Sequence, residues 1–259
     1  MGIANGSMGS RVTWAFADRT SGASSEPFAL GNLADHVGDD PAAVLANRAT
    51  LAGSLGLSLD HLVAMAPVHG REVGVVDSQT VSPVLGVDAL VTASPDLGLL
   101  VVAADCVPLL LGDPNAGVVA AVHAGWRGVE ADVVGATLEV MQDLGAVLTN
   151  VSAVVGPAIC GQCYEVEHDR YEAVTARAPH AASVTRTGGL GLDLRSAVSE
   201  RLEQVGIDVE TWGECTYESP RFYSFRRDPQ TGRHGGLIAL SGSADADSAD
   251  SGLAVAHHG

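Results

Sequence analysis

The sequence predicts an α/β protein with a mixed sheet and outer helices, and three observations indicate this class. Short apolar runs with little polar alternation follow one another between residues 61 and 125, and turn residues separate them. Such runs are typical of strands that are buried on both faces. Apolar residues recur at close to helical spacing over residues 129–144. The chain has 259 residues, of which 46% are hydrophobic, and this suffices for one large domain.

Each element has its own signal. Turn-forming Gly, Ser and Asp residues dominate as far as Asp40, and Pro41 stands at the first position of a helix predicted over residues 41–54. Six apolar runs predict strands within residues 61–70, 72–78, 88–96, 97–106, 107–117 and 118–125. The remaining predictions are a helix over 129–144, a strand over 151–155, helices over 168–178 and 193–206, a strand over 207–211, a loop over 215–236 and a final strand over 237–240.

The chain is expected to form a single domain. No internal repeat and no proline-rich linker interrupts residues 41–240. Residues 1–19 are interpreted as an N-terminal strand and lead-in, and residues 20–240 as the main domain. Residues 241–259 are small, acidic and of low complexity, so they are predicted to be a disordered tail.

The charge balance is strongly acidic. The chain has 14 arginines, no lysine and 31 acidic residues, for a formal net charge of −17. This argues against a nucleic-acid partner, because phosphate binding needs a basic face, and it favours solubility over membrane contact. The start has no apolar run of signal-peptide length, and no segment approaches the roughly 18 apolar residues of a membrane span. We therefore expect a cytoplasmic protein.

Three residues with metal-binding side chains fall where apolar runs end. They are His69 in PVHG, Cys106 in AADC and His123 in AVHAG. Side chains at strand ends share a crevice, which is where ligands usually bind. Two imidazoles and one thiolate are a typical zinc set, and three protein ligands leave a fourth position open for water or substrate, as catalysis requires. The sequence therefore predicts a catalytic metal centre of His69, Cys106 and His123.

Other roles for these residues stay open at this point. Each histidine or cysteine alone is more often a satisfied core residue, and zinc closed by a fourth protein ligand only stabilises a fold. Cys106 is either a metal ligand or a nucleophile with His123 as its base. Four cysteines in a chain this long do not make a disulfide framework. Cys160 and Cys163 form a C-x-x-C pair, which is a source of a fourth ligand, a redox or zinc element, or two incidental thiols.

The segment after His123 carries a tryptophan and an arginine between two glycines. Arg127 has a guanidinium that pairs with phosphate or carboxylate through two parallel hydrogen bonds, so it indicates an anionic substrate. Gly125 and Gly128 are expected to allow tight backbone turns near a ligand. Trp126 offers a flat apolar wall on which a base can stack.

Further arginines and one acidic residue are candidates. Arg226, Arg227 and Arg233 crowd into SFRRDPQTGR, either as part of an anion site or as surface ion pairs. Asp105 either orients a histidine or caps the next turn.

Several motifs in series resemble the YfiH-type family. They are HG at 69–70, ADCVPLLL at 104–111, AVHAGWRG at 121–128, and the segments NLADHVGDDPAAVLANR, DALVT, GPAI, CYEV, LDL and CTYESPRFYSFRRDPQTGR. The likeness covers most of residues 20–240. It implies that this segment is a YfiH-like catalytic domain. It implies an α/β/β/α sandwich, with His69, Cys106 and His123 as the metal-binding positions. The family usually has Gln two places before the first histidine, whereas this chain has Pro67.

Members of that family carry the names multicopper polyphenol oxidoreductase (laccase), purine nucleoside phosphorylase and peptidoglycan editing factor. The resemblance implies an enzyme that acts on purine nucleosides with phosphate and deaminates adenosine, with adenosine, inosine and methylthioadenosine as the nucleosides. Arg48 lies on the helix predicted over 41–54, and the phosphorolysis that the resemblance implies makes it, with Arg127, a candidate for holding phosphate. The metal of the enzyme is expected to be zinc, with copper as the alternative. Strict multicopper chemistry requires roughly ten histidines, and this chain has nine. The alternatives are a cysteine-nucleophile hydrolase or amidase, a peptidoglycan-precursor editing factor and, ranked lower, a copper polyphenol oxidase or a zinc-stabilised protein without activity.

Overall fold

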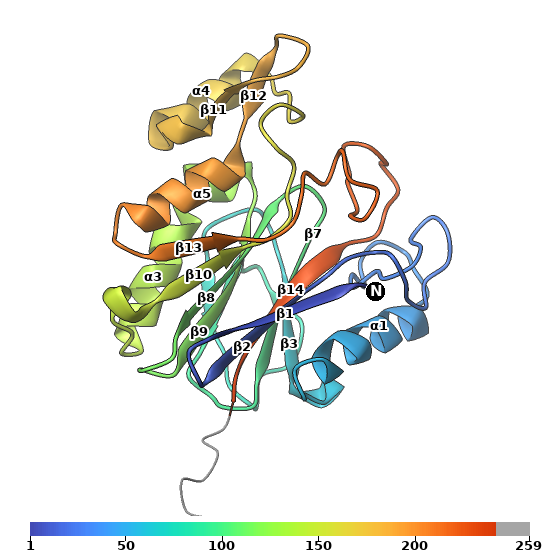
Figure 1. The fold of residues 1–259 in the computed structure, drawn as a ribbon, viewed down its shortest axis with the longest axis vertical. Helices are drawn as coiled ribbons and strands as arrows, with labels where there is room; N and C mark the ends of the chain where they lie inside the picture. Colours follow the sequence, from blue (N-terminus) through green and yellow to red (C-terminus); the bar gives the residue numbers. More distant parts are fainter. Residues whose placement is uncertain (242–259) are drawn as a thin grey trace, which may run out of the picture.

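The structure is a computed structural model, and it describes residues 1–241 (Figure 1). Two six-stranded mixed sheets account for most of the strands. In spatial order, the first sheet consists of β1 (Ile3–Met8), β2 (Val12–Ala17), β14 (His234–Leu240), β7 (Gly98–Ala103), β3 (Leu62–Ala66) and β5 (Val84–Leu85). The second consists of β13 (Asp208–Thr211), β10 (Ser152–Val155), β8 (Val107–Asp113), β9 (Val118–Ala124), β6 (Ala89–Thr92) and β4 (Val73–Val75).

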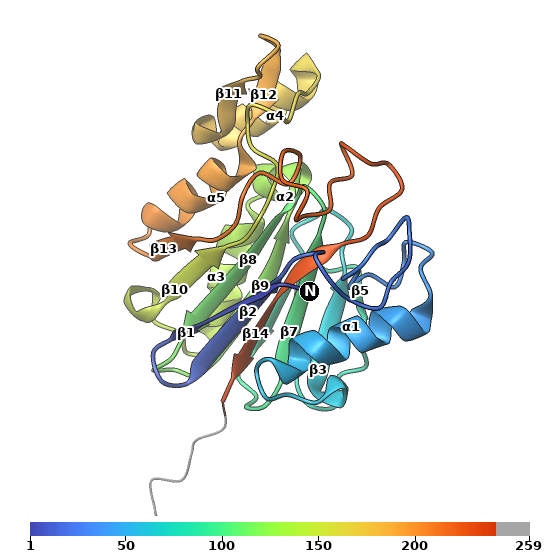
Figure 2. The ribbon, with the colours of Figure 1, turned by 45° about the vertical axis from the view of Figure 1, so that its right-hand side comes forward.

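Helices cover the outer faces of the two sheets. The helices are α1 (Pro41–Gly53), α2 (Trp126–Glu130), α3 (Val133–Asp143), α4 (His168–Arg177) and α5 (Leu194–Glu203), with single 3-10 turns at Leu59–His61, Leu148–Asn150 and Pro179–Ala181. Figure 2 shows α1 on one side of the stacked sheets and α3 and α5 on the other. The predicted α/β class and the α/β/β/α sandwich are confirmed.

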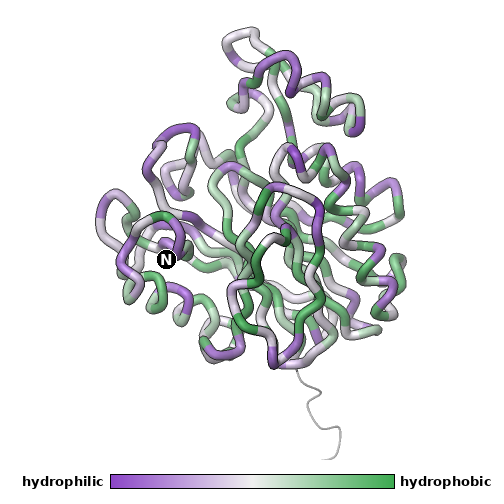
Figure 3. Tube along the Cα trace, turned by 180° about the vertical axis from the view of Figure 1, so that it is seen from behind, coloured by the Kyte–Doolittle hydropathy of each residue, from purple (hydrophilic) through white to green (hydrophobic). Residues whose placement is uncertain are grey.

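The core has three layers because the central strands are buried on both faces. Along β8, Leu109 and Leu111 pack toward the helices α3 and α5, and Leu110 packs toward the first sheet. A third apolar layer lies between the first sheet and α1. Figure 3 shows the hydrophobic residues gathered in the strands and the hydrophilic ones in the outer loops and helices. This explains why the strands appear in the sequence as apolar runs without polar alternation.

The register of the strands brings four strand ends to one edge of the sandwich. β3 and β7 are parallel, so both end there. β8 and β9 are antiparallel with Val107 opposite Ala124, so β8 begins where β9 ends. The short turn over 104–106 joins the end of β7 in one sheet to the start of β8 in the other. Residues at these four ends therefore lie close together at one edge of the sandwich.

The structure differs from the predicted elements at several places. The helix predicted over 129–144 is two helices, because Asp132 adopts a left-handed backbone (φ 59°) and its side chain caps α3 by accepting from the Gly135 N–H. The last strand begins at His234 rather than at 237. Residues 1–19 hold a hairpin of two strands, β1 and β2, that extends the first sheet beside β14.

The chain between α4 and α5 also departs from the prediction. It forms a small two-stranded antiparallel sheet, β11 (Ala182–Val184) and β12 (Leu190–Leu192), which the sequence did not indicate. Figure 1 shows this pair projecting with α4 beyond the end of the two large sheets. No helix within residues 1–241 is long and apolar enough to cross a membrane. The predicted tail lies, from residue 242 onward, outside the described residues.

Candidate active site

The converging strand ends bring together the three predicted metal ligands. His69 follows β3, Cys106 precedes β8, and His123 is the penultimate residue of β9. Their nitrogen and sulfur ligand atoms all lie within 4.8 Å of one another. The rings of His69 and His123 meet edge to face, with centroids 4.8 Å apart. Cys160 and Cys163 do not join this group, since they lie in a separate cluster.

His123 is held by a residue that the sequence analysis missed. Its Nδ1 lies 3.0 Å from Oδ1 of Asp88, and both side chains are buried. Burial opposes the charge on Asp88, but hydrogen bonds from His123 and from backbone N–H groups outweigh this effect and lower its pKa below the usual value. An ionised Asp88 accepts the Nδ1 proton of His123, so Nε2 is the nitrogen left for a metal or for Cys106.

Asp88 also fixes the loop that carries His69. Its two oxygens accept the backbone N–H groups of Val68, His69 and Gly70 at 3.3, 2.9 and 2.7 Å. His69 adopts a left-handed backbone with φ 63°, which is uncommon for a residue with a side chain. These three hydrogen bonds hold the loop in that conformation and aim the imidazole at the site.

Cys106 and His123 form a strongly coupled pair. Burial raises the pKa of the Cys106 thiol, but the charge and hydrogen bond of His123, with a hydrogen bond from His69, outweigh burial and bring the pKa to about 6. Burial likewise opposes protonation of His123, yet the thiolate and Asp88 raise its pKa to about 9. Two donors near one sulfur therefore favour the thiolate, which is the form that binds a metal or attacks a substrate.

Asp105 does not orient a histidine. Its Oδ1 accepts the Thr216 hydroxyl at 2.7 Å, and its Oδ2 accepts the Arg226 backbone N–H at 2.7 Å. Its backbone carbonyl accepts the N–H of Ile159 at 3.1 Å. Asp105 thus ties two distant loops to the turn that precedes Cys106. The role of orienting a histidine, which the sequence suggested for Asp105, belongs to Asp88.

Gly125 is required by space rather than by a tight turn. Its φ is −81°, which any residue adopts. A Cβ atom at this position would lie 2.9 Å from the His69 ring and 3.2 Å from the Cys106 sulfur. Gly128 lies within α2, where an added Cβ would meet the Gly70 carbonyl at 3.1 Å. Gly125 does lie at the turn from β9 into α2, but neither glycine has a positive φ, and close approach to the site explains why glycine stands there.

The three residues line a large cavity of about 880 Å³. Trp126, Tyr164 and Phe225 give it aromatic walls, and Pro67, Leu85 and Ile159 add apolar surface. Pro67 thus occupies a wall position two residues before the first histidine. A cavity of this size with mixed apolar and polar lining is suited to a small organic ligand.

Four of the chain's 14 arginines line this cavity, namely Arg127, Arg170, Arg226 and Arg233. In a chain of net charge −17, this concentration of positive charge beside only two lining carboxylates, Asp35 and Asp105, makes a wall suited to an anion. The guanidinium groups of Arg127 and Arg170 lie over the Trp126 ring, 4.5 and 4.7 Å from its centroid. The Nε atom of Arg170 is buried and has no hydrogen-bond partner among the described residues. Arg170 was not predicted, because it lies on α4, far along the chain.

The other predicted arginines lie outside the lining. Arg227 donates to the carbonyls of Thr216 and Phe222, both at 2.8 Å, so it holds its own loop together. Arg48 donates through Nε to the Leu33 carbonyl at 2.8 Å and pairs with Asp35 at 3.1 Å. Asp35 itself lines the cavity, so Arg48 lies one side chain behind the wall.

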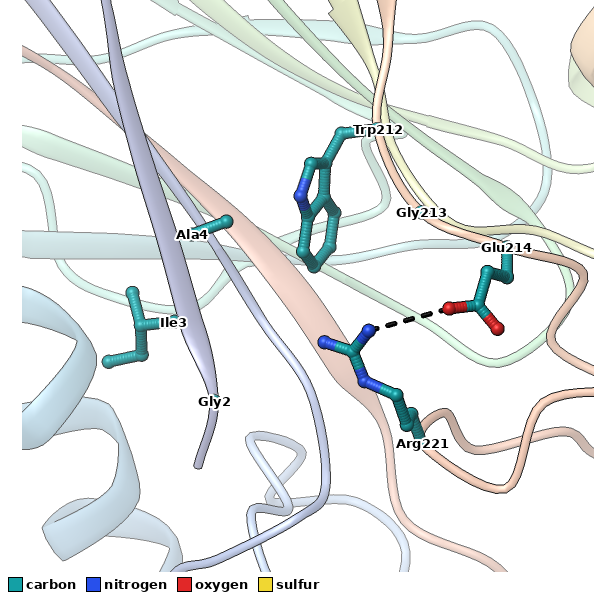
Figure 4. A pocket seen from close by; sticks show the side chains of 7 residues that line it. All are labelled: Gly2, Ile3, Ala4, Trp212, Gly213, Glu214 and Arg221. Atoms are coloured by element: carbon teal, nitrogen blue, oxygen red, sulfur yellow. Dashed lines mark hydrogen bonds and ion pairs between the residues drawn. The ribbon is translucent and has the colours of Figure 1, made fainter.

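A smaller cavity, of about 390 Å³, lies beside β1 (Figure 4). Trp212, Glu214 and Arg221 line it, and Figure 4 shows Arg221 directed at Glu214, with 3.4 Å between Nη1 and Oε1. Arg221 also pairs with Asp18 at 2.9 Å, so its charge is already compensated. Of the predicted site residues, all of which the structure describes, none lines this cavity, and we assign the chemistry to the larger one.

Comparison with known proteins shows the family to which the chain belongs. The sequence model of a family described as "Multi-copper polyphenol oxidoreductase laccase" matches residues 13–241. The chain belongs to this family. The laccase description names the family, and relatives within it carry other names. The predicted resemblance to YfiH-type proteins is confirmed by the structure of the Bacillus licheniformis hypothetical protein YfiH, which has a TM-score of 0.83 and 28% identity and covers 89% of this chain and 93% of its own.

Two proteins similar to this chain carry the names of enzymes that act on purine nucleosides. Purine nucleoside phosphorylase Rv2149c of Mycobacterium tuberculosis is 43% identical over 240 residues, covering 91% of this chain and 96% of the relative. Adenosine deaminase RL5, from an unknown prokaryotic organism, is 36% identical over 212 residues, covering 76% of this chain and 81% of the relative. The prediction of an enzyme is confirmed at the level of the family.

Proposed function

We propose that this chain is a zinc-dependent enzyme that cleaves purine nucleosides with phosphate and also deaminates adenosine. The observation that carries the proposal is the meeting of a His-Cys-His donor group with four arginines in one cavity. A metal site next to an anion-binding wall suits a reaction between phosphate and an uncharged nucleoside. The relatives named purine nucleoside phosphorylase and adenosine deaminase support the same substrate class.

The donor group fits zinc. Two imidazoles and one thiolate are a common set of three zinc ligands. A zinc-binding imidazole usually donates its other ring N–H to a carboxylate, and His123 has Asp88 in that place. When bound, zinc supplies a Lewis acid with an open position for an oxygen of water or phosphate. Copper is the alternative, because imidazole and thiolate bind it too. Multicopper chemistry needs further imidazole clusters, and the second ligand cluster in residues 1–241 holds no histidine.

Different residues around the donor group bind each of the two substrates. Arg127, Arg226 and Arg233 lie on the cavity wall, where charge-assisted hydrogen bonds hold phosphate. The rings of Trp126 and Tyr164 are covered by the guanidinium groups of arginines, so the planes of these arginines and the Phe225 ring supply the flat surface for the purine. Arg48 contributes by holding Asp35 at the wall rather than by touching phosphate.

Phosphorolysis joins a phosphate oxygen to the anomeric carbon of the ribose and breaks the bond from that carbon to the base. Deamination replaces the amino group of adenine with an oxygen from water and releases ammonia. Purine nucleoside and phosphate are therefore the proposed partners. The acidic surface favours neither nucleic acid nor membrane, and we propose the cytoplasm as the location.

Incubation with adenosine, inosine and methylthioadenosine, each with and without phosphate, tests the proposal. Phosphorolysis is expected to release free base and pentose phosphate only when phosphate is present, and deamination to form inosine from adenosine without it. Removal of the metal with a chelator is expected to stop both reactions, and reloading with zinc or with copper identifies the metal. No turnover of any of the three nucleosides by the zinc-loaded protein would contradict the proposal.

A second candidate uses the same residues without a metal. In it, Cys106 is a nucleophile, His123 is its base and Asp88 orients His123, which makes a hydrolase or amidase acting on peptidoglycan precursors. The 3.0 Å contact of His123 with Asp88 favours this arrangement as well as the metal site. The variant Cys106→Ala separates the two: loss of one bound metal ion together with activity supports the zinc enzyme, and loss of activity with an unchanged metal content supports the nucleophile.

A further inference from the structure

A second cluster of metal-binding side chains lies outside the candidate active site. It consists of Cys160, Cys163, Cys215 and Glu218, whose sulfur and carboxylate oxygen atoms all lie within 4.8 Å of one another. The Cys163 sulfur lies 3.3 Å from Oε1 of Glu218, and the Cys215 sulfur accepts the backbone N–H of Cys160 at 3.3 Å. All three cysteines are free thiols. None of the four residues lines the large cavity.

Two loops build this cluster, and the backbone holds them together. The C-x-x-C pair lies in the loop between β10 and α4, and the other two members lie in the loop between β13 and β14. A parallel β-bridge joins Ala158 of the first loop to Cys215 of the second. Within each loop a turn brings its two ligands together: the Cys163 N–H donates to the Cys160 carbonyl at 3.0 Å, and the Glu218 N–H to the Cys215 carbonyl at 3.2 Å.

We propose that these four side chains bind a structural zinc ion. Three thiolates and one carboxylate complete a tetrahedron, so no position stays open for a substrate. With zinc–sulfur bonds of about 2.3 Å, the sulfur atoms of a tetrahedral site lie about 3.8 Å apart. Separations of at most 4.8 Å therefore need to close by only about 1 Å, which side-chain rotation provides. A C-x-x-C pair with two ligands distant in sequence is a common arrangement at such sites.

The charges around the cluster also suit a divalent cation. Three thiolates and a carboxylate carry four negative charges, and a zinc ion leaves two of them uncompensated. Arg186 forms an ion pair with Glu218 and compensates one more. Its backbone N–H donates to the Gln162 carbonyl at 3.1 Å, inside the C-x-x-C segment, so this arginine is anchored at the site. The chain thus supplies four donors and one balancing cation.

The zinc ion fastens together two walls of the candidate active site. Tyr164, next to the C-x-x-C pair, and Arg226, in the second loop, both line the large cavity. The Arg226 guanidinium lies 4.9 Å from the centroid of the Tyr164 ring and donates to the Glu165 carbonyl at 2.9 Å. A metal cross-link between the loops keeps these contacts in place, and with them one arginine of the anion-binding wall.

Zinc counting on the full chain, purified under reducing conditions and desalted after zinc saturation, tests this inference. With both sites occupied, the wild type holds two zinc ions per chain, and Cys163→Ser and Cys106→Ala each hold one. After exchange for cobalt, the ion left in Cys106→Ala is expected to show the near-ultraviolet absorption of three cobalt–thiolate bonds. The ion left in Cys163→Ser should show the absorption of one.

The two zinc sites fail separately in this experiment. If the active-site metal is wrong, the wild type holds one ion, which Cys163→Ser loses and Cys106→Ala keeps. The structural site is overturned if Cys163→Ser binds as much zinc as the wild type. It is also overturned if Cys160 and Cys163 form a disulfide and the protein still binds no zinc at this cluster after the disulfide is reduced. If Cys163→Ser does not fold, Glu218→Gln keeps all three thiols and is expected to weaken zinc binding at least tenfold. An unchanged dissociation constant there also overturns the proposal.

Discussion

Asp88 and His123 form a buried pair in which the carboxylate lies 3.0 Å from Nδ1 of the imidazole. The same carboxylate accepts the backbone N–H groups of Val68, His69 and Gly70. One side chain therefore orients one imidazole of the site and holds the loop that carries the other. The geometry of the donor group depends on Asp88 although Asp88 is not one of the three donors.

The variant Asp88→Asn is expected to bind zinc about 10- to 100-fold more weakly, because the amide neither carries the charge nor offers two acceptor oxygens. Competition with a chelator of known affinity measures this loss. Asp60→Asn, at an exposed position, is the control and should bind zinc as the wild type does. Equal zinc affinities in the two variants would remove Asp88 from its assigned role.

The variant Gly125→Ala is expected to abolish zinc binding at the active site while the fold is retained. Its Cβ would lie 2.9 Å from the His69 ring and 3.2 Å from the Cys106 sulfur, which pushes two ligands apart. Gly53→Ala, whose Cβ meets nothing within 4 Å on α1, is the matched control. Circular dichroism shows whether the fold is retained, and metal analysis measures how much zinc the site binds. Zinc retention in Gly125→Ala equal to that of the control would show that the ligands do not converge as described.

The variant Arg127→Ala is expected to raise the KM for phosphate about ten- to a hundredfold, since a charge-assisted hydrogen bond contributes roughly 1.5–3 kcal/mol. Zinc content and the deamination rate without phosphate should change much less, because this arginine lies on the wall rather than among the ligands. Arg195→Ala, on α5 outside the cavity lining, serves as the control. A phosphate KM that stays at the wild-type value assigns phosphate to other arginines.

His234 is predicted to make the fold sensitive to acid. It is fully buried, and burial lowers its pKa to about 4, with Nε2 3.3 Å from the Pro157 carbonyl. In the unfolded chain its pKa is about 6.5, so between pH 6.5 and 4 the unfolded state binds a proton that the folded state does not. Stability present above pH 6.5 is therefore lost as the pH falls, by up to about 3 kcal/mol at pH 4.

The variant His234→Phe tests this dependence. Phenylalanine keeps a ring beside Phe222 and Tyr223 but cannot take up a proton. Urea unfolding at intervals between pH 4 and 7 should show a shallower loss of stability in the variant than in the wild type. The slope is the readout, because the lost hydrogen bond lowers stability equally at every pH. Parallel curves for the two proteins would contradict the assignment.

The meeting of His69, Cys106 and His123 could be predicted from the sequence because each lies at or close to the end of a buried strand. Strand ends converge by topology, and this needs no knowledge of side-chain contacts. Asp88 escaped prediction since it precedes β6, and most of its partners are backbone N–H groups, which leave no pattern of side chains in the sequence. Arg170 and Cys215 could not be predicted for a different reason. Long irregular loops before or around these residues bring them to their clusters, and hydrophobic periodicity does not predict the course of a loop.

Among the elements, the break at Asp132 was hidden because α2 and α3 lie side by side against the same part of the molecule. Apolar spacing therefore continues across the break, and the left-handed backbone at an aspartate has no strong signal in the sequence. The pair β11 and β12 has strands of three residues, too short for an apolar run. His234 was assigned to a loop because two glycines follow it, and glycine is usually rare within strands.

The position of β14 has a consequence for the order in which the protein can assemble. This strand, the last one described, lies between β2 and β7, which belong to the first half of the chain. On a ribosome, which releases the N-terminal part first, β2 has no neighbour on its inner side until residues 234–240 have emerged. The amino-terminal hairpin must therefore wait until β14 has emerged before its sheet can close, and a chaperone that shields this open edge has most to protect before that stage.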